Sequence, residues 1–576
     1  YALYHAFTSF GKEHFKKFGL IAAVGLALFF ILDMNSEASL PNTLSWLTIA
    51  GIAFLLLGGM KLVGKVTKSE TAGAVLATLL GLVAPVIMGA QGWDDHDRSN
   101  KTTAHDVAYN YMSAVSPNGI IFTNGDNDTF PLWYIQEVEG FRSDVRVCNL
   151  SLMQTDWYTA QMMRKTYDSD PLPIKFSPDQ ILMYTGNTDQ IQFVNLSDLY
   201  LGNSASTEIL KKIIDLRVKV NKATAVKAVE TFATSMAAVM SGFEIAQPAV
   251  QQRVAQLREV LTRPAQVNDL TNDIHLRFTG MRELFGALQN QAITPTENTI
   301  KGFQEAYQQL SQGWESMDLA DAMAFLRDDN NMLTTKAGSA RFFPTNVFTL
   351  KVNKDNVLKS GTIPSNTDKS KIMDEVIFKM EVNSLTREEI MMMDILANNE
   401  WKRGIYFSSP YGSKLSRALL NAGALKQTGS TYEVNPIRQD APIDVEEMYE
   451  SLMKKQHFGK MNDPKVVTDY YARRHVIQYR SQFASLVRYY LHTIDQAERV
   501  KAYPESYIDM IKNQPVLQPA EAEVLELRKN ADQVIAEGKK RVSALLDRSQ
   551  EVMPVEIVLD GGEPNPAGSF KYQGAN

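Results

Sequence analysis

Three apolar runs stand out in the first 90 residues, and the rest of the chain is more evenly mixed. The runs are Phe18–Leu32, Trp46–Met60, which continues weakly to Val63, and Ala72–Ala90. A helix that crosses a bilayer needs about 20 apolar residues. The pattern therefore predicts three transmembrane helices, most strongly at the third run, which contains no charged residue. A buried helical hairpin is the alternative.

The charges that flank these runs alternate in sign. Positive, negative, positive and negative groups follow one another along the chain: Lys12, Lys16 and Lys17; Asp33 and Glu37; Lys61, Lys65 and Lys68; Asp94, Asp95 and Asp97. Positively charged loops stay on the cytoplasmic side of a membrane. The alternation predicts an integral membrane protein of the bacterial inner membrane, with everything after Gln91 periplasmic, or lumenal in a eukaryotic cell. The chain begins at Tyr1 without a signal peptide, so we expect it to be the C-terminal part of a longer membrane protein.

The clearest pattern after the apolar runs is a strand–helix–strand unit over residues 116–152. Gly119–Thr123 is apolar and β-branched, Phe130–Val138 is apolar at helical spacing, and Asp144–Leu150 forms a second apolar run. Asp128 or Thr129 is placed to cap the helix, and Gly140 to end it. In open α/β sheets, ligands bind at the carboxyl ends of the strands. The loop between the first strand and the helix is therefore the first candidate site.

The remaining pattern predicts an α/β extracytoplasmic domain with a helical insertion and a helical C-terminal region, preceded by the three transmembrane helices. The boundaries are transmembrane helices at 1–91, a first α/β part at 92–204, a helical insertion at 205–330, a second α/β part at 331–440, a helical region at 441–550 and a mobile tail at 551–576. Within the second α/β part, Thr386 and Glu389 match a capping box. The Tyr/Arg-rich segment Tyr470–Tyr490 reads as a helix with a solvated basic face.

Composition narrows the function further. The chain of 576 residues is too long for one core, so several domains are expected. A net charge of −6 and a pI near 5.9 argue against nucleic acid as a partner. Cys148 is the single cysteine and lies in an apolar strand, which indicates a small buried hydrophobic residue.

Polar and ionisable residues gather in two stretches that we take as candidate binding sites. Carboxylates can accept the proton of a substrate hydroxyl, and a guanidinium can hold a phosphate through two parallel hydrogen bonds. The candidates for acceptor or donor binding are Asp94, Asp95, His96, Asp97, Arg98, Asp126, Asn127, Asp128, Thr129, Trp133 and Tyr134. In each stretch, capping and turn formation by the acidic residues is the simpler alternative.

A calcium loop of the EF-hand type does not fit the second stretch. That loop needs glycine at its sixth position and glutamate at its twelfth. Counted from Asn124, these positions hold Thr129 and Ile135, and counted from Asp126 they hold Pro131 and Glu137. The identity of any bound metal stays unknown.

Several motifs in order along the chain resemble one known family. They are WDDHDRSN at 93–100, GDNDTFPLWY at 125–134, FFPTNVFTLKV at 342–352 and DVEEMYESLMKK at 444–455. Together they are similar to the C-terminal half of the DUF2723, or protein O-mannosyltransferase-like (GT-C type), membrane glycosyltransferases. The similarity runs from about Ala72 to Met553 and is weakest over Thr207–Leu326.

The resemblance implies an enzyme that moves a sugar from a lipid-phosphate donor to Ser or Thr of extracytoplasmic proteins. A polyprenyl-phosphate sugar is the implied donor, and the membrane bilayer and periplasmic acceptor proteins are the implied partners. The catalytic carboxylate of such enzymes lies in the first outer loop, so no catalytic residue is assigned to this chain. The soluble domain would bind or orient the acceptor. A non-catalytic, membrane-anchored periplasmic binding or assembly domain is the second hypothesis.

Overall fold

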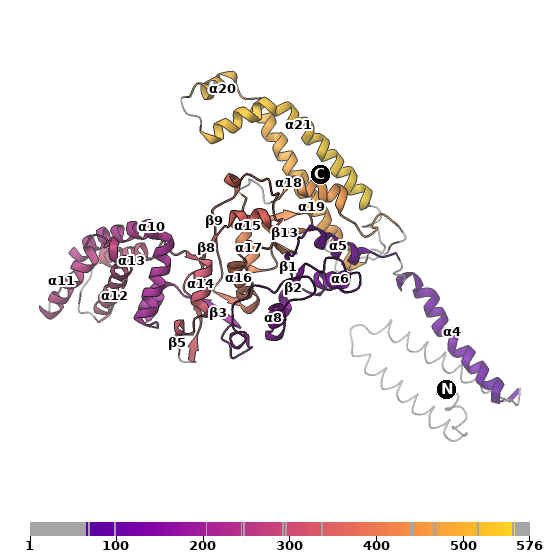
Figure 1. Cartoon of the computed structure of the whole chain (residues 1–576), viewed down its shortest axis with the longest axis horizontal. Coiled ribbons are helices and arrows are strands. Elements are labelled where there is room, and N and C mark those ends of the chain that lie inside the picture. The colour runs from indigo at the N-terminus through magenta and orange to yellow at the C-terminus, as the bar shows by residue number, and fades with distance from the viewer. Residues whose placement is uncertain are drawn as a thin grey trace. The chain divides into compact units, whose positions relative to one another are not determined.

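The computed structural model describes residues 65–66, 70–96, 100–202, 204–243, 245, 248–290, 293, 297–335, 338–437, 443–464, 466, 469–514, 518–555 and 558. The chain divides into two compact units, residues 1–100 and residues 101–576. In the first unit the structure describes helix α4, Glu70–His96. The second unit contains the sheets and all the other helices given below (Figure 1).

A five-stranded sheet forms the centre of the second unit. Its spatial order is β12-β13-β11-β1-β2, with bounds Leu425–Thr428, Thr431–Val434, Ile405–Phe407, Ile120–Thr123 and Arg146–Asn149. Strand β1 pairs in parallel with both β2 and β11, whereas β13 is antiparallel to β11 and to β12. Helix α6, Asp126–Glu137, connects β1 to β2. The predicted parallel strand–helix–strand unit is therefore confirmed.

Both faces of this sheet are covered, which explains why β1 is apolar at every position rather than at alternate ones. Ile120 and Phe122 belong to one buried cluster, and Ile121 between them belongs to a second. All three side chains are at most 2% exposed. Cys148 of β2 is fully buried, so the prediction of a small buried hydrophobic residue is confirmed.

Smaller sheets flank the central one. A three-stranded sheet has the order β10-β3-β7 (Ser384–Thr386, Gln190–Phe193, Phe342–Phe343), another has the order β4-β8-β9 (Met317–Asp318, Val347–Lys351, Glu375–Lys379), and β5 (Leu333–Thr335) pairs with β6 (Gly338–Ala340). Helices accompany these strands: α5 (Thr103–Ala114), α7 (Leu150–Met153), α8 (Asp156–Met162), α9 (Leu196–Gly202), α14 (Leu319–Arg327), α15 (Lys354–Lys359), α16 (Arg387–Asn399), α17 (Lys414–Asn421) and α18 (Val445–Glu450).

Two groups of longer helices complete the second unit. Helix α10 (Thr207–Ser241) packs with α11 (Pro248–Thr262), α12 (Leu270–Gln289) and α13 (Glu297–Ser311). Near the C-terminus, α19 (Tyr470–Lys501) and α21 (Pro519–Val552) lie side by side, with α20 (Glu505–Lys512) between them in sequence (Figure 1).

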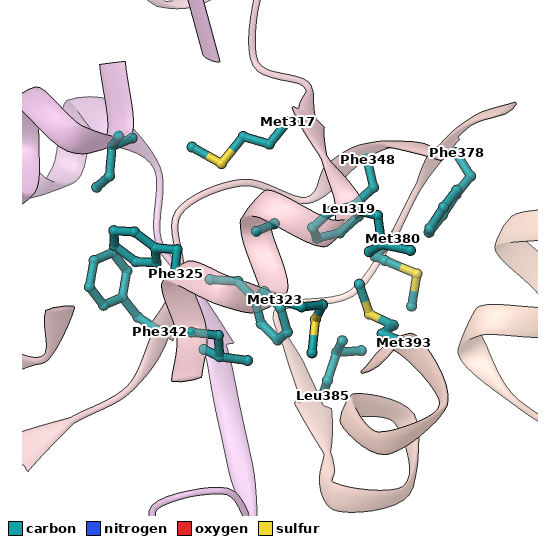
Figure 2. Packing of buried hydrophobic residues seen from close by; sticks show 14 of the residues in the cluster. Met317, Leu319, Met323, Phe325, Phe342, Phe348, Phe378, Met380, Leu385 and Met393 are labelled. Atoms are coloured by element: carbon teal, nitrogen blue, oxygen red, sulfur yellow. The ribbon is translucent and has the colours of Figure 1, made fainter. Parts of the chain in front are cut away.

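Phenylalanine and methionine side chains fill the core between α14, α16 and the two three-stranded sheets. Figure 2 shows Met323 of α14 and Met393 of α16 on facing elements, with Phe348 and Phe378 of paired strands close by. Methionine fills irregular gaps because its side chain is unbranched and flexible. All three residues of the run Met391–Met393 are at most 1% exposed.

The expected three preceding transmembrane helices are not supported, and the fold class is corrected to a mixed α/β architecture. In the parts of the chain that the structure describes, no helix is both long and apolar enough to span a membrane. The third apolar run lies in α4, which contains Pro85. The first two runs lie outside the described residues.

The six predicted segments and the boundaries between them remain predictions. The structure separates the chain once, between Asn100 and Lys101. Most of the predicted mobile tail, residues 551–576, lies outside the described residues.

Candidate functional site

A cavity lies at the carboxyl ends of β1 and β11, and we call it the β1–β11 cavity. Residues Gly125–Asp128, which we call the GDND loop, line it. From β1 the chain crosses to β2 on one side, and from β11 it continues to β12 and β13 on the other. Such a divergence leaves a crevice at the strand ends of an open α/β sheet. The cavity has a volume of about 580 Å³. Its lining is Tyr111, Asn124, Gly125, Asp126, Asn127, Asp128, Ser408, Ser409, Pro410, Tyr411, Tyr432, Tyr471, Arg474, His475 and Gln478.

Asp128 holds the loop between β1 and α6 in shape. Its Oδ2 accepts the backbone N–H of Asn124 at 2.8 Å, and its Oδ1 accepts that of Gly125 at 2.9 Å. Oδ2 also accepts the hydroxyl of Ser408 at 2.6 Å, which ties this loop to the end of β11. Hydrogen bonds to a charged acceptor are the stronger ones. Asp128 is thus committed to the local structure and to the junction of two strands.

Asp126 and Asn127 stand at the start of α6 and are exposed in the cavity wall. Within the described residues, the Asp126 carboxylate forms no hydrogen bond or ion pair, in contrast to the three hydrogen bonds that Asp128 accepts. The two carboxylates that look equivalent in sequence therefore differ in role. Asp126 is the one available to a ligand.

Thr129, Trp133 and Tyr134 lie on α6 but do not line the cavity. Thr129 is fully buried, and its hydroxyl donates to the Gly125 carbonyl at 2.6 Å and accepts from Asn149 Nδ2 at 2.9 Å. Trp133 packs against the core, and the Tyr134 side chain is 49% exposed. The structure places these three residues around the site rather than in it.

The first turns of α19 form the opposite wall, about 350 residues further along the chain than the GDND loop. Arg474 and Tyr471 are exposed there, and burial lowers the pKa of His475 below its ordinary value. Gln478 donates to the hydroxyl of Tyr111 at 2.8 Å. The helix predicted over Tyr470–Tyr490 is confirmed as part of α19, and the exposed Arg474 agrees with the expected solvated basic face. In the sequence, only the combination of Tyr, Arg, His and Gln in this segment could have indicated that it lines a binding cavity.

Tyrosines form much of the remaining lining. Tyr411, which follows β11, is 66% exposed, and Tyr471 is 56% exposed. Tyr432 of β13 is partly buried. Their rings give apolar faces beside hydrogen-bonding edges, which suits a ligand that is polar around its rim and apolar on its faces.

The other predicted stretch, Asp94–Arg98, belongs to the first unit, whereas all residues that line this cavity belong to the second. Asp94, Asp95 and His96 form the last residues of α4 in the first unit, and Asp97 and Arg98 lie outside the described residues. No group of three or more His, Cys, Asp or Glu side chains in the described part of the chain is arranged to hold a metal ion. The β1–β11 cavity instead offers carboxylate, amide, guanidinium and phenol groups for hydrogen bonding.

Exchanging each aspartate for asparagine separates these two roles. Asp128→Asn should lower the free energy of unfolding by about 1.5–3 kcal/mol, because one amide cannot replace an acceptor of three hydrogen bonds. Asp126→Asn should change it by less than about 0.5 kcal/mol, as for an exposed residue. Urea unfolding of both variants measures the difference. Equal destabilisation by the two changes would contradict the assignment.

Comparison with known proteins places most of this chain in a different family from the one expected. The model of a family described as TMEM260-associated domain 2 matches residues 104–285 and 287–452, which is more than half of the chain and includes the GDND loop and β11. The expected DUF2723 and protein O-mannosyltransferase-like assignment is therefore wrong. The name of the matching model associates this domain with a membrane-protein family.

Neither the search of curated proteins nor the search of solved structures found a match. The match of the family model over both halves of the α/β fold and the helices between them is sufficient for assignment. The chain belongs to the family defined by TMEM260-associated domain 2.

Proposed function

We propose that this chain is the acceptor-binding part of a membrane-associated glycosyltransferase, and that the β1–β11 cavity holds the acceptor or the sugar. The transferase moves a sugar from a lipid-phosphate donor to Ser or Thr of extracytoplasmic proteins. In that reaction the hydroxyl oxygen bonds to the sugar as the bond to the lipid phosphate breaks, and the hydroxyl proton passes to a base. We assign this chain the binding role and name no catalytic residue in it.

One observation carries the proposal: an uncommitted carboxylate, Asp126, faces a cavity at a topological switch point of an α/β sheet. A carboxylate accepts hydrogen bonds from hydroxyl groups, and Arg474 and Gln478 supply donors to the same space. The rings of Tyr411 and Tyr471 can pack against the apolar face of a sugar or a peptide side chain. Asn127 adds both a donor and an acceptor.

The proposed donor and the family name together indicate where this activity would take place. A lipid-phosphate donor requires that the enzyme work at a membrane, and the family name associates the domain with a membrane-protein family. We place residues 101–576 on the extracytoplasmic side, in a bacterial periplasm, where the acceptor proteins are. This placement is part of the proposal.

The transferase proposal is tested by measuring protein glycosylation in cells that lack the gene. Mass analysis of envelope proteins should show loss of a hexose-type modification on Ser or Thr, restored by the wild-type gene. Asp126→Asn should restore at most about a tenth of it, the loss of one charge-assisted contact in a binding site. Asp179→Asn, which changes an exposed aspartate outside the cavity, is the matched control and should restore it fully.

An unchanged glycoproteome in cells without the gene would refute the transferase proposal and favour a non-catalytic binding or assembly domain. Full restoration by Asp126→Asn would instead remove the β1–β11 cavity from the proposal. Expression of each variant at the wild-type level separates both results from loss of folding.

A further inference from the structure

A second cavity lies at the carboxyl ends of another parallel strand pair, and we call it the β4–β8 cavity. Strands β4 and β8 pair in parallel, with Asp318 in register with Thr349. Helix α14 begins directly after β4, whereas Asn124 and Gly125 separate β1 from α6. The cavity has a volume of about 620 Å³ and shares no lining residue with the β1–β11 cavity. Two cavities at strand ends thus lie within the described part of the chain.

The floor of the β4–β8 cavity contains a buried hydroxyl group without a hydrogen bond. Thr349 lines the cavity, its side chain is 1% exposed, and its Oγ1 has no partner among the described residues. Most buried polar groups in folded proteins are hydrogen-bonded, because leaving one unsatisfied costs free energy. Alternate residues of a strand share a face, so Thr349 and Lys351 point the same way from β8. The oxygen itself has almost no accessible surface, so a ligand that satisfies this hydroxyl must displace a side chain that covers it.

The charged side chains in the lining balance one another. Three are cationic and three are anionic: Lys219, Lys351, Lys354, Asp318, Asp321 and Glu400. Each has an opposite charge within 4 Å. Lys219 pairs with Asp321 at 2.6 Å, and Lys351 with Asp318 at 3.4 Å. Lys354 pairs with Asp374 at 2.7 Å, and Glu400 with Lys402 at 2.5 Å.

This balance selects among ligand classes. A cavity without excess charge has little attraction for a simple ion. Ammonium groups donate hydrogen bonds and carboxylates accept them, so paired Lys and Asp side chains suit a group that does both. Hydroxyl groups do both, and adjacent hydroxyls repeat the pattern. Leu319, Leu396 and the rest of the apolar lining suit the carbon face of a ring.

The backbone at the edge of the cavity is held in an uncommon conformation. Glu400 and Trp401 follow α16 with φ of 51° and 63°, two consecutive non-glycine residues in the left-handed region. The indole N–H of Trp401 donates to the Lys351 carbonyl at 2.8 Å, which fixes the ring against the end of β8. Glu400 is the left-handed C-cap of α16, a common way for a helix to end, so this conformation sets the direction of the chain at the edge of the cavity.

We infer that the β4–β8 cavity is a saccharide-binding site, with the Thr349 hydroxyl and the Lys219–Asp321 and Lys351–Asp318 pairs as its hydrogen-bonding groups. A neutral, polyhydroxylated ring satisfies the unpaired hydroxyl and bridges the ion pairs without adding charge. This site is additional to the β1–β11 cavity and does not depend on the function proposed for that cavity.

Calorimetric titration of the full chain with D-mannose, D-glucose, a mannotriose and, separately, inorganic phosphate tests the inference. At least one saccharide should bind, and Thr349→Val should weaken its binding at least tenfold. Thr349→Ser, which keeps the hydroxyl, should bind within about threefold of wild type. Thr334→Val, a change of an exposed strand threonine outside the cavity, is the matched control and should bind as wild type does. Thr349→Val should not lower the melting temperature, because it removes an unsatisfied group.

Asp126→Asn distinguishes the two cavities. Binding that survives Asp126→Asn and is lost in Thr349→Val supports the β4–β8 site. Binding that is lost in Asp126→Asn and kept in Thr349→Val overturns this inference and leaves the proposed function standing. Absence of saccharide binding, or binding of phosphate alone, also overturns it, whatever the envelope glycoproteins show.

Discussion

Replacing Asp394 by alanine should lower the free energy of unfolding by about 3–5 kcal/mol, because it removes a buried acceptor and leaves the partly buried Arg327 guanidinium without its partner. The Asp394 side chain is fully buried and forms an ion pair with Arg327 of α14. Arg327 contacts Oδ1, which also accepts a hydrogen bond from Asn398 Nδ2 at 2.9 Å, and Oδ2 accepts the backbone N–H of Lys175 at 2.6 Å. One carboxylate therefore joins α16, α14 and the segment around Lys175.

Urea unfolding measures this effect, with Asp179→Ala as the matched control on an exposed aspartate. A loss below about 1 kcal/mol would match a surface ion pair and would contradict the buried role of Asp394. The Arg327 guanidinium also lies over the ring of Phe176, 5.9 Å from its centroid. The loss should be accompanied by a change in the fluorescence of the protein or in the amide hydrogen exchange of the segment around Lys175 and Phe176.

Replacing Glu433 by glutamine should remove a pH dependence of stability that the wild type carries. The Glu433 side chain is buried in β13, where burial raises the pKa of its carboxyl from 4.5 to about 8. The Tyr406 hydroxyl donates to it at 2.6 Å and Asn435 Nδ2 at 3.1 Å, but these contacts do not offset the loss of water around the charge.

The sign follows from proton binding in the two states. Between pH 4.5 and about 8 the unfolded chain has an ionised Glu433, whereas the folded chain keeps the proton. The folded state then binds more protons, so stability falls as pH rises, by up to about 1.4 kcal/mol per pH unit from this residue. Glutamine imitates the neutral carboxyl and does not titrate.

Urea unfolding of wild type and Glu433→Gln at pH 5, 6, 7 and 8 should give two curves that diverge with pH, with the variant more stable at the alkaline end. Glu259→Gln, on the exposed face of α11, is the control for removal of a carboxylate and should run parallel to the wild type. Parallel curves for Glu433→Gln and wild type would show that Glu433 is ionised in the folded state.

Local patterns in the sequence determined the strand–helix–strand unit around the candidate site. The β-branched run became β1, the apolar run ahead of Leu150 became β2, and Gly140, with φ of 66°, follows the end of α6. These features depend on side-chain periodicity and on backbone conformations within a few residues. For that reason the loop between β1 and α6 could be placed at a strand end from sequence alone.

Caps were predicted less well, because a capping side chain can serve a distant helix. Helix α6 begins at Asp126 rather than near Phe130, with Gly125 as its N-cap. Glu389 does not complete a capping box with Thr386. Its carboxylate accepts the backbone N–H groups of Lys414 and Leu415 at the start of α17, at 2.6 and 3.1 Å.

Apolar content and motif likeness led to two further errors. The runs in the first 90 residues matched the length of membrane spans, but no helix in the described part of the chain meets that requirement. The order of motifs suggested one family, and the family model that matches is another. Run length and motif likeness do not test how a segment packs or how the whole domain compares.

Only the tertiary structure decided what completes the candidate site and which aspartate is free in it. Ser408 arrives with β11 and the wall of Arg474 and His475 with α19, both through contacts between segments hundreds of residues apart. The same folding commits Asp128 to Ser408 and leaves Asp126 open to the cavity. Sequence spacing specifies neighbours along a helix or strand, whereas the partners of a side chain across a cavity depend on how the sheet orders its strands.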